Sequence, residues 1–187
     1  GVYRSGVIAA RQVLNLAGLD DAGTFTAPVY FNHLRFGTYY KDIVLDAAAE
    51  NDFNPLFLYS VIRQESLFEG FVTSTANARG VMQIIPSTGQ EIANYLGWPV
   101  GYTEADLYRP VVNIEFGASY LARQRSAFGG DLYEALAAYN GGAGNTLKWA
   151  ELSNGDPDLL VEVIRFSETR SYIRYISELF SIYRDLY

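Results

Sequence analysis

Apolar residues recur every three or four positions along most of the chain, which is the spacing of one face of an α-helix. The strict alternation typical of a half-buried strand is nearly absent, and residues 71–85, with Val81, Ile84 and Ile85, are the one candidate for a short β-hairpin. We therefore predict an all-α, mainly helical fold. The predicted helices lie at about residues 7–14, 43–48, 55–66, 86–97, 110–128, 131–141 and 172–183.

Local sequence signals define several ends of these helices. Asn54 before Pro55 is an N-cap residue followed by a proline in the first turn, so the third helix has a strong start signal. Asp131 followed by Glu134 resembles a capping box, and the helix that it opens is predicted to end at the glycine pair after Asn140. Tyr139 and Asn140 are therefore expected at a helix end.

Length and composition indicate one compact domain with a flanking piece. The chain has 187 residues and is 49% hydrophobic, which is enough for one sizeable core. After the opening helix, a stretch containing Gly, Thr and Pro extends through Pro28. We therefore predict a helical flanking segment at residues 1–38 and the main domain at residues 39–187.

Charge and composition exclude several classes of function. The formal net charge is −7, with only 14 Lys and Arg residues, which argues against a nucleic-acid partner. The chain has no cysteine, and His33 is its single histidine, so thiolate metal sites and a Ser-His-Asp triad are not expected. No metal or organic cofactor is implied, and His33 is expected to be an ordinary surface or packing residue. No apolar run approaches the roughly 20 residues of a membrane span, and the start at Gly1-Val2-Tyr3-Arg4 has no signal-peptide pattern.

Glu65 is the candidate catalytic acid. It ends a helical segment in which Leu58, Val61 and Ile62 recur at helical spacing, and Phe68 follows it. A carboxyl group among such residues loses hydration, so its pKa rises and it can donate a proton near neutral pH. Cleavage of a glycosidic bond needs such a group. Taken alone, a glutamate on a helix is more often a solvated residue or an ion-pair partner.

Four ordered segments raise the odds for catalysis. They are Glu65 through Ser74, Gly80-Val81-Met82-Gln83, Ala138-Tyr139-Asn140-Gly141-Gly142 and Glu168-Thr169-Arg170-Ser171-Tyr172. Together they resemble the motifs of the soluble lytic transglycosylase catalytic domain, which is related to goose-type lysozymes, over about residues 40–187. The resemblance implies a lysozyme-like fold. It also implies that residues 1–38 are the remnant of an upstream helical domain.

The same resemblance implies a function and a location. Glu65 would protonate the oxygen between N-acetylmuramic acid and N-acetylglucosamine, and as a carboxylate would then accept the proton of the muramic C6 hydroxyl. That hydroxyl would close a 1,6-anhydro ring, so the cleavage of peptidoglycan would be non-hydrolytic. The expected partner is the glycan strand, and the expected location is the periplasm, cell envelope or exterior of a bacterium. The oligomeric state is open, with a monomer favoured.

The resemblance further implies six substrate-binding residues, each with a plainer alternative. They are Ser66, Ser74, Gln83, Tyr139, Asn140 and Glu168. Ser74 is equally well explained as a turn hydroxyl, and Gln83 or Asn140 as a residue that shapes a turn. Tyr139 is alternatively a core residue whose hydroxyl has found a convenient partner. Met82 is interpreted as packing rather than as a ligand contact.

Two other functions remain in competition. A goose-lysozyme-like hydrolase would use the same acid with water as the acceptor, and would need a second carboxylate such as Glu168, Asp131 or Glu69. A catalytically silent glycan-binding module would keep the groove without turnover, although retention of the polar motifs counts against it. A purely structural helical domain is the weakest interpretation because it leaves those motifs unexplained.

Overall fold

The computed structural model describes residues 2–19 and 21–187 and is helical in nearly all of its regular structure. The elements are α1 (Tyr3–Leu16), η1 (Asp21–Thr26), α2 (Val29–Arg35), α3 (Lys41–Glu50), α4 (Pro55–Ser66), α5 (Pro86–Leu96), η2 (Glu104–Tyr108), α6 (Pro110–Ala127), α7 (Leu132–Gly141), α8 (Ala143–Ser153), α9 (Pro157–Val163) and α10 (Ser167–Leu186), where η marks a 3-10 helix. The described residues form no strand. The candidate hairpin is reduced to two isolated bridges, Thr73–Arg79 and Arg79–Ile84.

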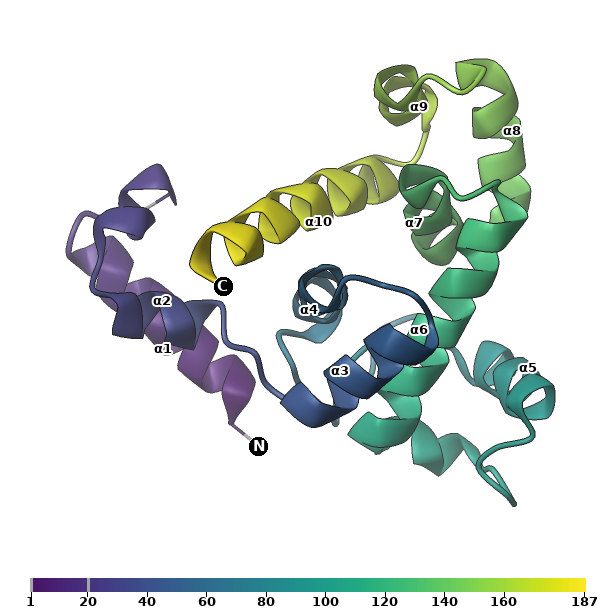
Figure 1. Ribbon diagram of the computed structural model, residues 1–187, viewed down its shortest axis with the longest axis horizontal. Helices are drawn as coiled ribbons and strands as arrows, with labels where there is room; N and C mark the ends of the chain where they lie inside the picture. Colours follow the sequence, from purple (N-terminus) through teal and green to yellow (C-terminus); the bar gives the residue numbers. More distant parts are fainter. Residues whose placement is uncertain (1, 20) are drawn as a thin grey trace.

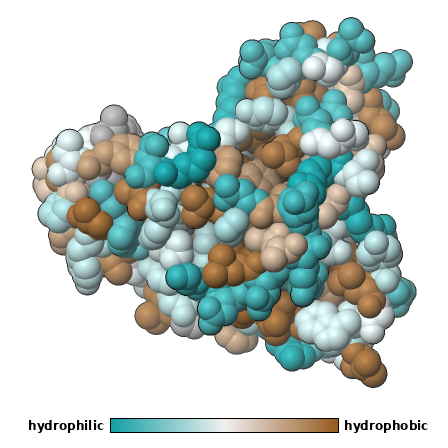
Figure 2. Space-filling model, viewed as in Figure 1, coloured by the Kyte–Doolittle hydropathy of each residue, from teal (hydrophilic) through white to brown (hydrophobic). Residues whose placement is uncertain are grey.

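The helices surround α4. Helix α10 packs against α4 and α7, while α6 packs against α3 and α7. Figure 1 shows α1 and α2 at one end of the molecule, α8 and α9 at the other, and α5 beside the lower half of α6. In the space-filling view, the outline is indented between these two ends, and hydrophilic and hydrophobic residues are interspersed on the face shown (Figure 2).

The larger of two hydrophobic clusters encloses α4 on all sides. Every residue from Phe57 to Ile62 is buried, so this helix has no solvent-facing stripe in its middle. A helix buried all round lies in the core rather than on it. Its neighbours in the cluster come from α3, α6, α7 and α10. The chain therefore places the C-terminal end of α4, which carries Glu65, inside the domain.

A smaller hydrophobic cluster includes Ile84 of the 71–85 segment. It joins α5, η2 and the first half of α6 through the side chains of Ile84, Ile92, Ala93, Leu107, Val112 and Phe116. The ring of Tyr139 packs against both clusters. Tyr139 therefore links the two hydrophobic clusters.

The predicted caps are present. Asn54 Oδ1 accepts a hydrogen bond of 2.9 Å from the Leu56 amide, and Pro55 follows in the first turn. Asp131 Oδ1 accepts one of 2.8 Å from the Glu134 amide, which is the Asp131 half of the predicted capping box. These contacts satisfy amide groups that an α-helix leaves free at its start.

Three helices were missed and one boundary was wrong. Sequence patterns did not indicate α2, α8 or α9, because α2 and α9 have only seven residues each and α8 follows directly on the glycine pair that ends α7. Helix α10 begins at Ser167 rather than near Tyr172. Glu168 therefore lies in the first turn of that helix and not in a linker.

The flanking segment is attached mainly through aromatic side chains. The Tyr3 ring stacks on Tyr39 at 4.3 Å between centroids, and the Tyr183 hydroxyl donates to the Gly37 carbonyl at 3.2 Å. The ring of His33 stacks on Tyr187 at 4.9 Å, as expected for a packing histidine. The domain boundary at residue 38 stays a prediction. None of the described helices combines the length and the apolar character needed to cross a membrane.

Candidate active site

Glu65 lies in the last turn of α4 beside the larger cluster. Leu58, Val61 and Ile62 on the same helix are fully buried, as is Phe68, which follows it. Burial raises the pKa of the Glu65 carboxyl to about 7, a hydrogen bond from Tyr172 lowers it, and the charge of Glu168 raises it. A substantial share of the carboxyl therefore carries a proton near neutral pH, unlike an ordinary glutamate.

Tyr172 holds the acid in place from the opposite helix. Its hydroxyl donates a hydrogen bond of 2.6 Å to Glu65 Oε1, and its ring on α10 is only 4% exposed. One Glu65 oxygen is thus fixed by the tyrosine, which leaves the other to carry the proton. The pKa of Tyr172 is raised well above its usual range by burial and by the Glu65 charge, so the tyrosine remains a donor.

Asn113 on α6 fixes the backbone of the segment that faces the acid. This fully buried side chain accepts a 2.6 Å hydrogen bond from the Met82 amide through Oδ1. Its Nδ2 donates to the carbonyls of Arg79 and Leu107, both at 2.8 Å. One amide therefore satisfies three backbone groups that would otherwise be buried without partners.

Gly80 makes room for that contact. Its φ is +78°, and a Cβ built at this position would lie 2.2 Å from the Leu107 carbonyl oxygen and 2.5 Å from Asn113 Nδ2. A residue with a side chain would thus meet both a backbone conformation and a space that suit glycine alone. The glycine of the Gly80-Val81-Met82-Gln83 segment is needed for the shape of the turn.

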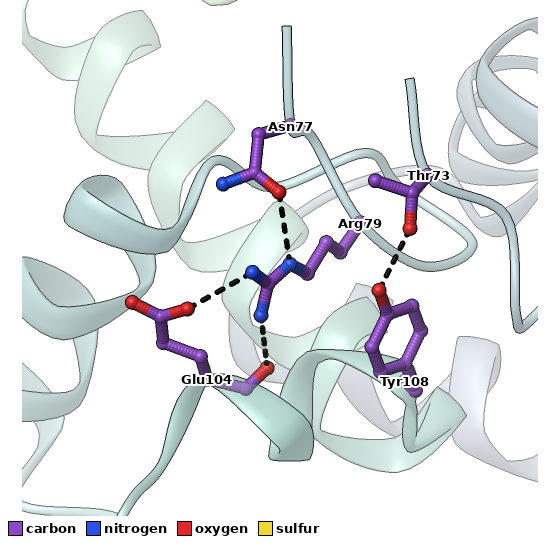
Figure 3. A network of polar contacts seen from close by, with 5 residues as sticks. All are labelled: Thr73, Asn77, Arg79, Glu104 and Tyr108. Atoms are coloured by element: carbon purple, nitrogen blue, oxygen red, sulfur yellow. Dashed lines mark hydrogen bonds and ion pairs between the residues drawn. The ribbon is translucent and has the colours of Figure 1, made fainter. Parts of the chain in front are cut away.

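The outer side of the segment is held by a polar network (Figure 3). Arg79 forms an ion pair of 2.9 Å with Glu104 and donates a hydrogen bond of 3.3 Å to Asn77 Oδ1. The hydroxyls of Thr73 and Tyr108 lie 2.7 Å apart. Such exposed contacts are individually weak, but together they tie the segment to η2.

A pocket of about 330 Å³ lies where the segment meets α7. We call it the active-site pocket; it is lined by Gln83, Ile84, Ile85, Thr88, Tyr120, Ala138, Tyr139, Asn140, Gly141 and Gly142. Tyr139 connects it to the acid, because burial and then the charge of Glu65 raise the pKa of this tyrosine. Tyr139 therefore joins a pocket lined by amide and hydroxyl groups to the Glu65 carboxyl.

The pattern of motifs and this geometry agree with a known family. A model of the family described as Transglycosylase SLT domain matches residues 42–159. The chain belongs to this family. Two curated relatives of the SLT domain are the soluble lytic murein transglycosylases of Salmonella typhimurium, 34% identical over 82% of the chain, and of Escherichia coli K12, 32% identical over 82%. The chain spans about a quarter of these relatives, because 24% of each is covered.

Solved structures match the SLT domain over nearly its whole length. The 70 kDa soluble lytic transglycosylase of Escherichia coli gives a TM-score of 0.79 at 28% identity, covering 98% of this chain and 29% of that one. An inactive glutamate-to-glutamine variant of the lytic transglycosylase Slt from Pseudomonas aeruginosa gives 0.76 at 27%, covering 97% and 30%. The lysozyme-like, helical fold is confirmed.

The structure brings some of the predicted site residues together. Gln83, Tyr139 and Asn140 line one pocket, and Glu168 is exposed on the first turn of α10, where its charge acts on Glu65. Asn140 Oδ1 accepts a hydrogen bond of 2.7 Å from the Thr169 hydroxyl, which orients its amide. Contact of these residues with a substrate stays a prediction.

Several predicted hydroxyl and amide groups are already engaged within the protein. The Ser66 hydroxyl donates to the Val81 carbonyl at 2.8 Å and joins α4 to the 71–85 segment. Ser74 Oγ accepts from the Ala78 amide at 3.0 Å, as in the turn interpretation. Gln83 Nε2 donates to the Gly80 carbonyl, and the Tyr139 hydroxyl donates to the Met82 carbonyl, both at 2.8 Å. These bonds shape the site whether or not the same groups also bind substrate.

Sequence reasoning missed three positioning residues. Asn113, Thr169 and Tyr172 were not singled out, although Thr169 and Tyr172 lie in the quoted motif. The sequence does carry a sign of the role of Asn113, because this amide residue stands between the apolar residues Val112 and Ile114 on a helix that packs against the core. A buried amide in such a place needs hydrogen-bond partners. Among the described residues, no cluster of three or more His, Asp or Glu is placed to hold a metal ion.

Proposed function

We propose that this chain is the catalytic domain of a lytic transglycosylase that cleaves the bond between N-acetylmuramic acid and N-acetylglucosamine in peptidoglycan. The observation that carries the proposal is the Glu65 carboxyl, whose pKa is raised by burial to about 7 beside a polar pocket. An acid with this pKa serves equally well as a proton donor and, once ionised, as a proton acceptor near neutral pH.

The reaction has two proton transfers through one residue. Protonated Glu65 donates its proton to the glycosidic oxygen while the bond from that oxygen to the muramic anomeric carbon breaks. The ionised Glu65 then takes the proton of the C6 hydroxyl as that oxygen bonds to the anomeric carbon. The acid returns to its starting state, and the glycan ends in a 1,6-anhydro ring without consuming water.

The environment of Glu65 supports a single-acid scheme. Tyr172 donates to Oε1, and an oxygen of either a carboxyl or a carboxylate group can accept this bond, which therefore suits both proton transfers. Glu168 is the carboxylate whose charge raises the pKa of Glu65, and it is exposed at the start of α10. A substrate N-acetyl group can stabilise the positive charge at the anomeric carbon in place of a second carboxylate.

Named relatives supply independent support. The curated relatives are called murein transglycosylases, some soluble and some membrane-bound. One similar structure is an inactive glutamate-to-glutamine variant, and another is a complex of the 70 kDa enzyme with bulgecin A. By this likeness we infer a bacterial source and action in the periplasm or elsewhere in the cell envelope. The oligomeric state stays a prediction, with a monomer favoured.

The decisive experiment is mass spectrometry of the muropeptides released from purified peptidoglycan by the wild-type chain and by Glu65→Gln. We expect 1,6-anhydromuramic ends from the wild type and none from the variant. Reducing muramic ends would instead identify a hydrolase of the goose-lysozyme kind. Glycan binding with no release by the wild type would identify a silent binding module.

A further inference from the structure

Thr169 carries a buried hydroxyl to which the proposed reaction gives no part. The residue lies in the first turn of α10 and is only 1% exposed. Its Oγ1 donates a hydrogen bond of 2.7 Å to Asn140 Oδ1, which lies 29 positions earlier in the chain, near the end of α7. Since Asn140 lines the active-site pocket, this bond joins α10 to a residue of the pocket wall.

The place of Thr169 at the start of a helix makes its hydroxyl available for this contact. Serine and threonine hydroxyls inside helices commonly donate to the carbonyl four residues earlier. Ser60 on α4 and Ser177 on α10 do so, at 2.8 and 2.9 Å. The residue four positions before Thr169 precedes α10, and the hydroxyl donates to Asn140 instead.

Gly141 allows α7 and α10 to come close enough for the bond. A Cβ at Gly141 would lie 3.0 Å from Thr169 Oγ1 and 3.1 Å from the Trp149 ring. A side chain at this position would therefore push the hydroxyl away from Asn140. The glycine that follows Asn140 thus has a steric role in the contact.

The bond fixes which way the Asn140 amide is turned. Within the described part of the chain, the Thr169 hydroxyl has no other hydrogen-bond partner, so Asn140 has to present its acceptor, Oδ1. A reversed amide would leave the buried hydroxyl proton without an acceptor, which is unfavourable. Asn140 Nδ2 makes no hydrogen bond among the described residues and is not buried. At this point the pocket wall therefore offers a donor.

We propose that Thr169 is a positioning residue that turns the Asn140 amide so that Nδ2 donates a hydrogen bond to an oxygen atom of the bound glycan. The inference rests on the proposed function, which places a glycan strand in the active-site pocket. Thr169 itself acts only through Asn140. Without the hydroxyl, the amide can adopt both orientations, and only one of them presents the donor to the glycan.

The first test measures binding in the Glu65→Gln background, by cosedimentation with insoluble peptidoglycan. Thr169→Val keeps the shape of the side chain and removes the hydroxyl, so we expect the affinity to fall about tenfold. Thr169→Ser keeps the hydroxyl and should bind nearly as well as the parent. Ser177→Ala removes a hydroxyl elsewhere on α10 and serves as the control, with no expected change in affinity.

The direction of the bond is tested at Asn140. Asn140→Asp keeps an acceptor for Thr169 but loses the donor, so it should bind the glycan at least as weakly as Asn140→Ala. In the Asn140→Ala background, Thr169→Val should cause no further loss, because the two residues act as one unit. Affinity like that of the parent in Asn140→Asp, or an additional loss in the double variant, overturns the inference.

The result is separate from that of the proposed function. Release of 1,6-anhydromuramic products by the wild type tests the function, whereas the affinities of the Glu65→Gln variants test the role of Thr169. If the wild type releases no product, the proposed function fails. If Thr169→Val binds as well as the parent, or Thr169→Ser binds as weakly as Thr169→Val, the role of Thr169 fails whatever the products are.

Discussion

The two sides of the active site are built on different physical principles. On the acid side, α4 and α10 surround Glu65 with apolar residues and supply one hydrogen bond, from Tyr172. On the segment side, residues 71–85 bury Val81, Met82 and Ile84 in the two hydrophobic clusters, and a set of backbone hydrogen bonds centred on Asn113 holds the turn. Desolvation thus sets the reactivity, while hydrogen bonds set the shape of the wall that faces it.

The two sides also contribute to the stability of the fold with opposite sign. An acid with a raised pKa destabilises the folded state when ionised, so the acid side gives up stability for reactivity. The segment side gains stability from each satisfied amide and carbonyl group, because an unpaired buried group costs about 1–3 kcal/mol. Substitutions on the two sides should therefore have opposite consequences for folding.

Glu65→Gln should have the largest effect on activity and a stabilising effect at high pH. Loss of the proton donor should lower kcat by about 10²–10⁴-fold or more. Because the folded pKa of about 7 lies above the ordinary glutamate value of 4.5, the wild type loses stability as pH rises between these values, by up to about 3 kcal/mol. The variant lacks this dependence, so urea unfolding should find it more stable at pH 8 and similar at pH 4.

Equal stability of wild type and Glu65→Gln at pH 8 would contradict the proposed cost of the acid. A wild-type cleavage rate in that variant would remove Glu65 from the mechanism altogether. The two measurements are independent, so each can fail separately.

Asn113→Leu should have the largest effect on folding. The substitution leaves the Met82 amide and the Arg79 and Leu107 carbonyls without their partner, so we expect a loss of about 3–5 kcal/mol in the free energy of unfolding. Thermal or urea denaturation measures it. Gln90→Leu removes an exposed amide from α5 and serves as the control, with a change within about 0.5 kcal/mol.

Gly80→Ala should destabilise the segment side by more than its backbone angle explains. Gly80 and Gly97 both have positive φ, at +78° and +65°, but only Gly80 is crowded, by the Leu107 carbonyl and Asn113. Gly97→Ala should cost about 1–2 kcal/mol, the usual penalty of that conformation. Gly80→Ala should exceed it in the same denaturation assay, and equal losses would show that the close approach is unimportant.

Tyr172→Phe should move the pH dependence of activity without removing the acid. The hydrogen bond from Tyr172 favours the ionised carboxylate, so its loss raises the pKa of Glu65 further. The acid then stays protonated to higher pH, and the alkaline limb of the kcat/KM profile shifts upward. A downward shift would mean that Tyr172 acts mainly in some way other than through this bond.

Glu168→Gln should give a smaller shift of the opposite sign. Of the three effects on the pKa of Glu65, the negative charge of Glu168 is the smallest, and it raises that pKa. Removing it lowers that pKa, so the alkaline limb should move to lower pH. An upward shift, or complete loss of turnover on peptidoglycan, would indicate that Glu168 has a more direct part in the reaction.

The sequence alone determined the helical class, the caps at Asn54 and Asp131, and the apolar setting of Glu65. Each depends on residues within one or two helical turns, so local spacing is sufficient to reveal it. The motif order also indicated the family. Short helices such as α9 were missed because seven residues carry too little periodicity to be recognised.

Only the tertiary structure decided which groups meet. Tyr172 lies 107 positions from Glu65 in the chain, and Asn113 lies 31 positions from Met82. Such hydrogen bonds depend on how α4, α6 and α10 pack, which no local pattern encodes. Residue spacing along the chain identified Glu65 as the acid. The packing of helices that are distant in the sequence set the pKa of Glu65 and the shape of the site around it.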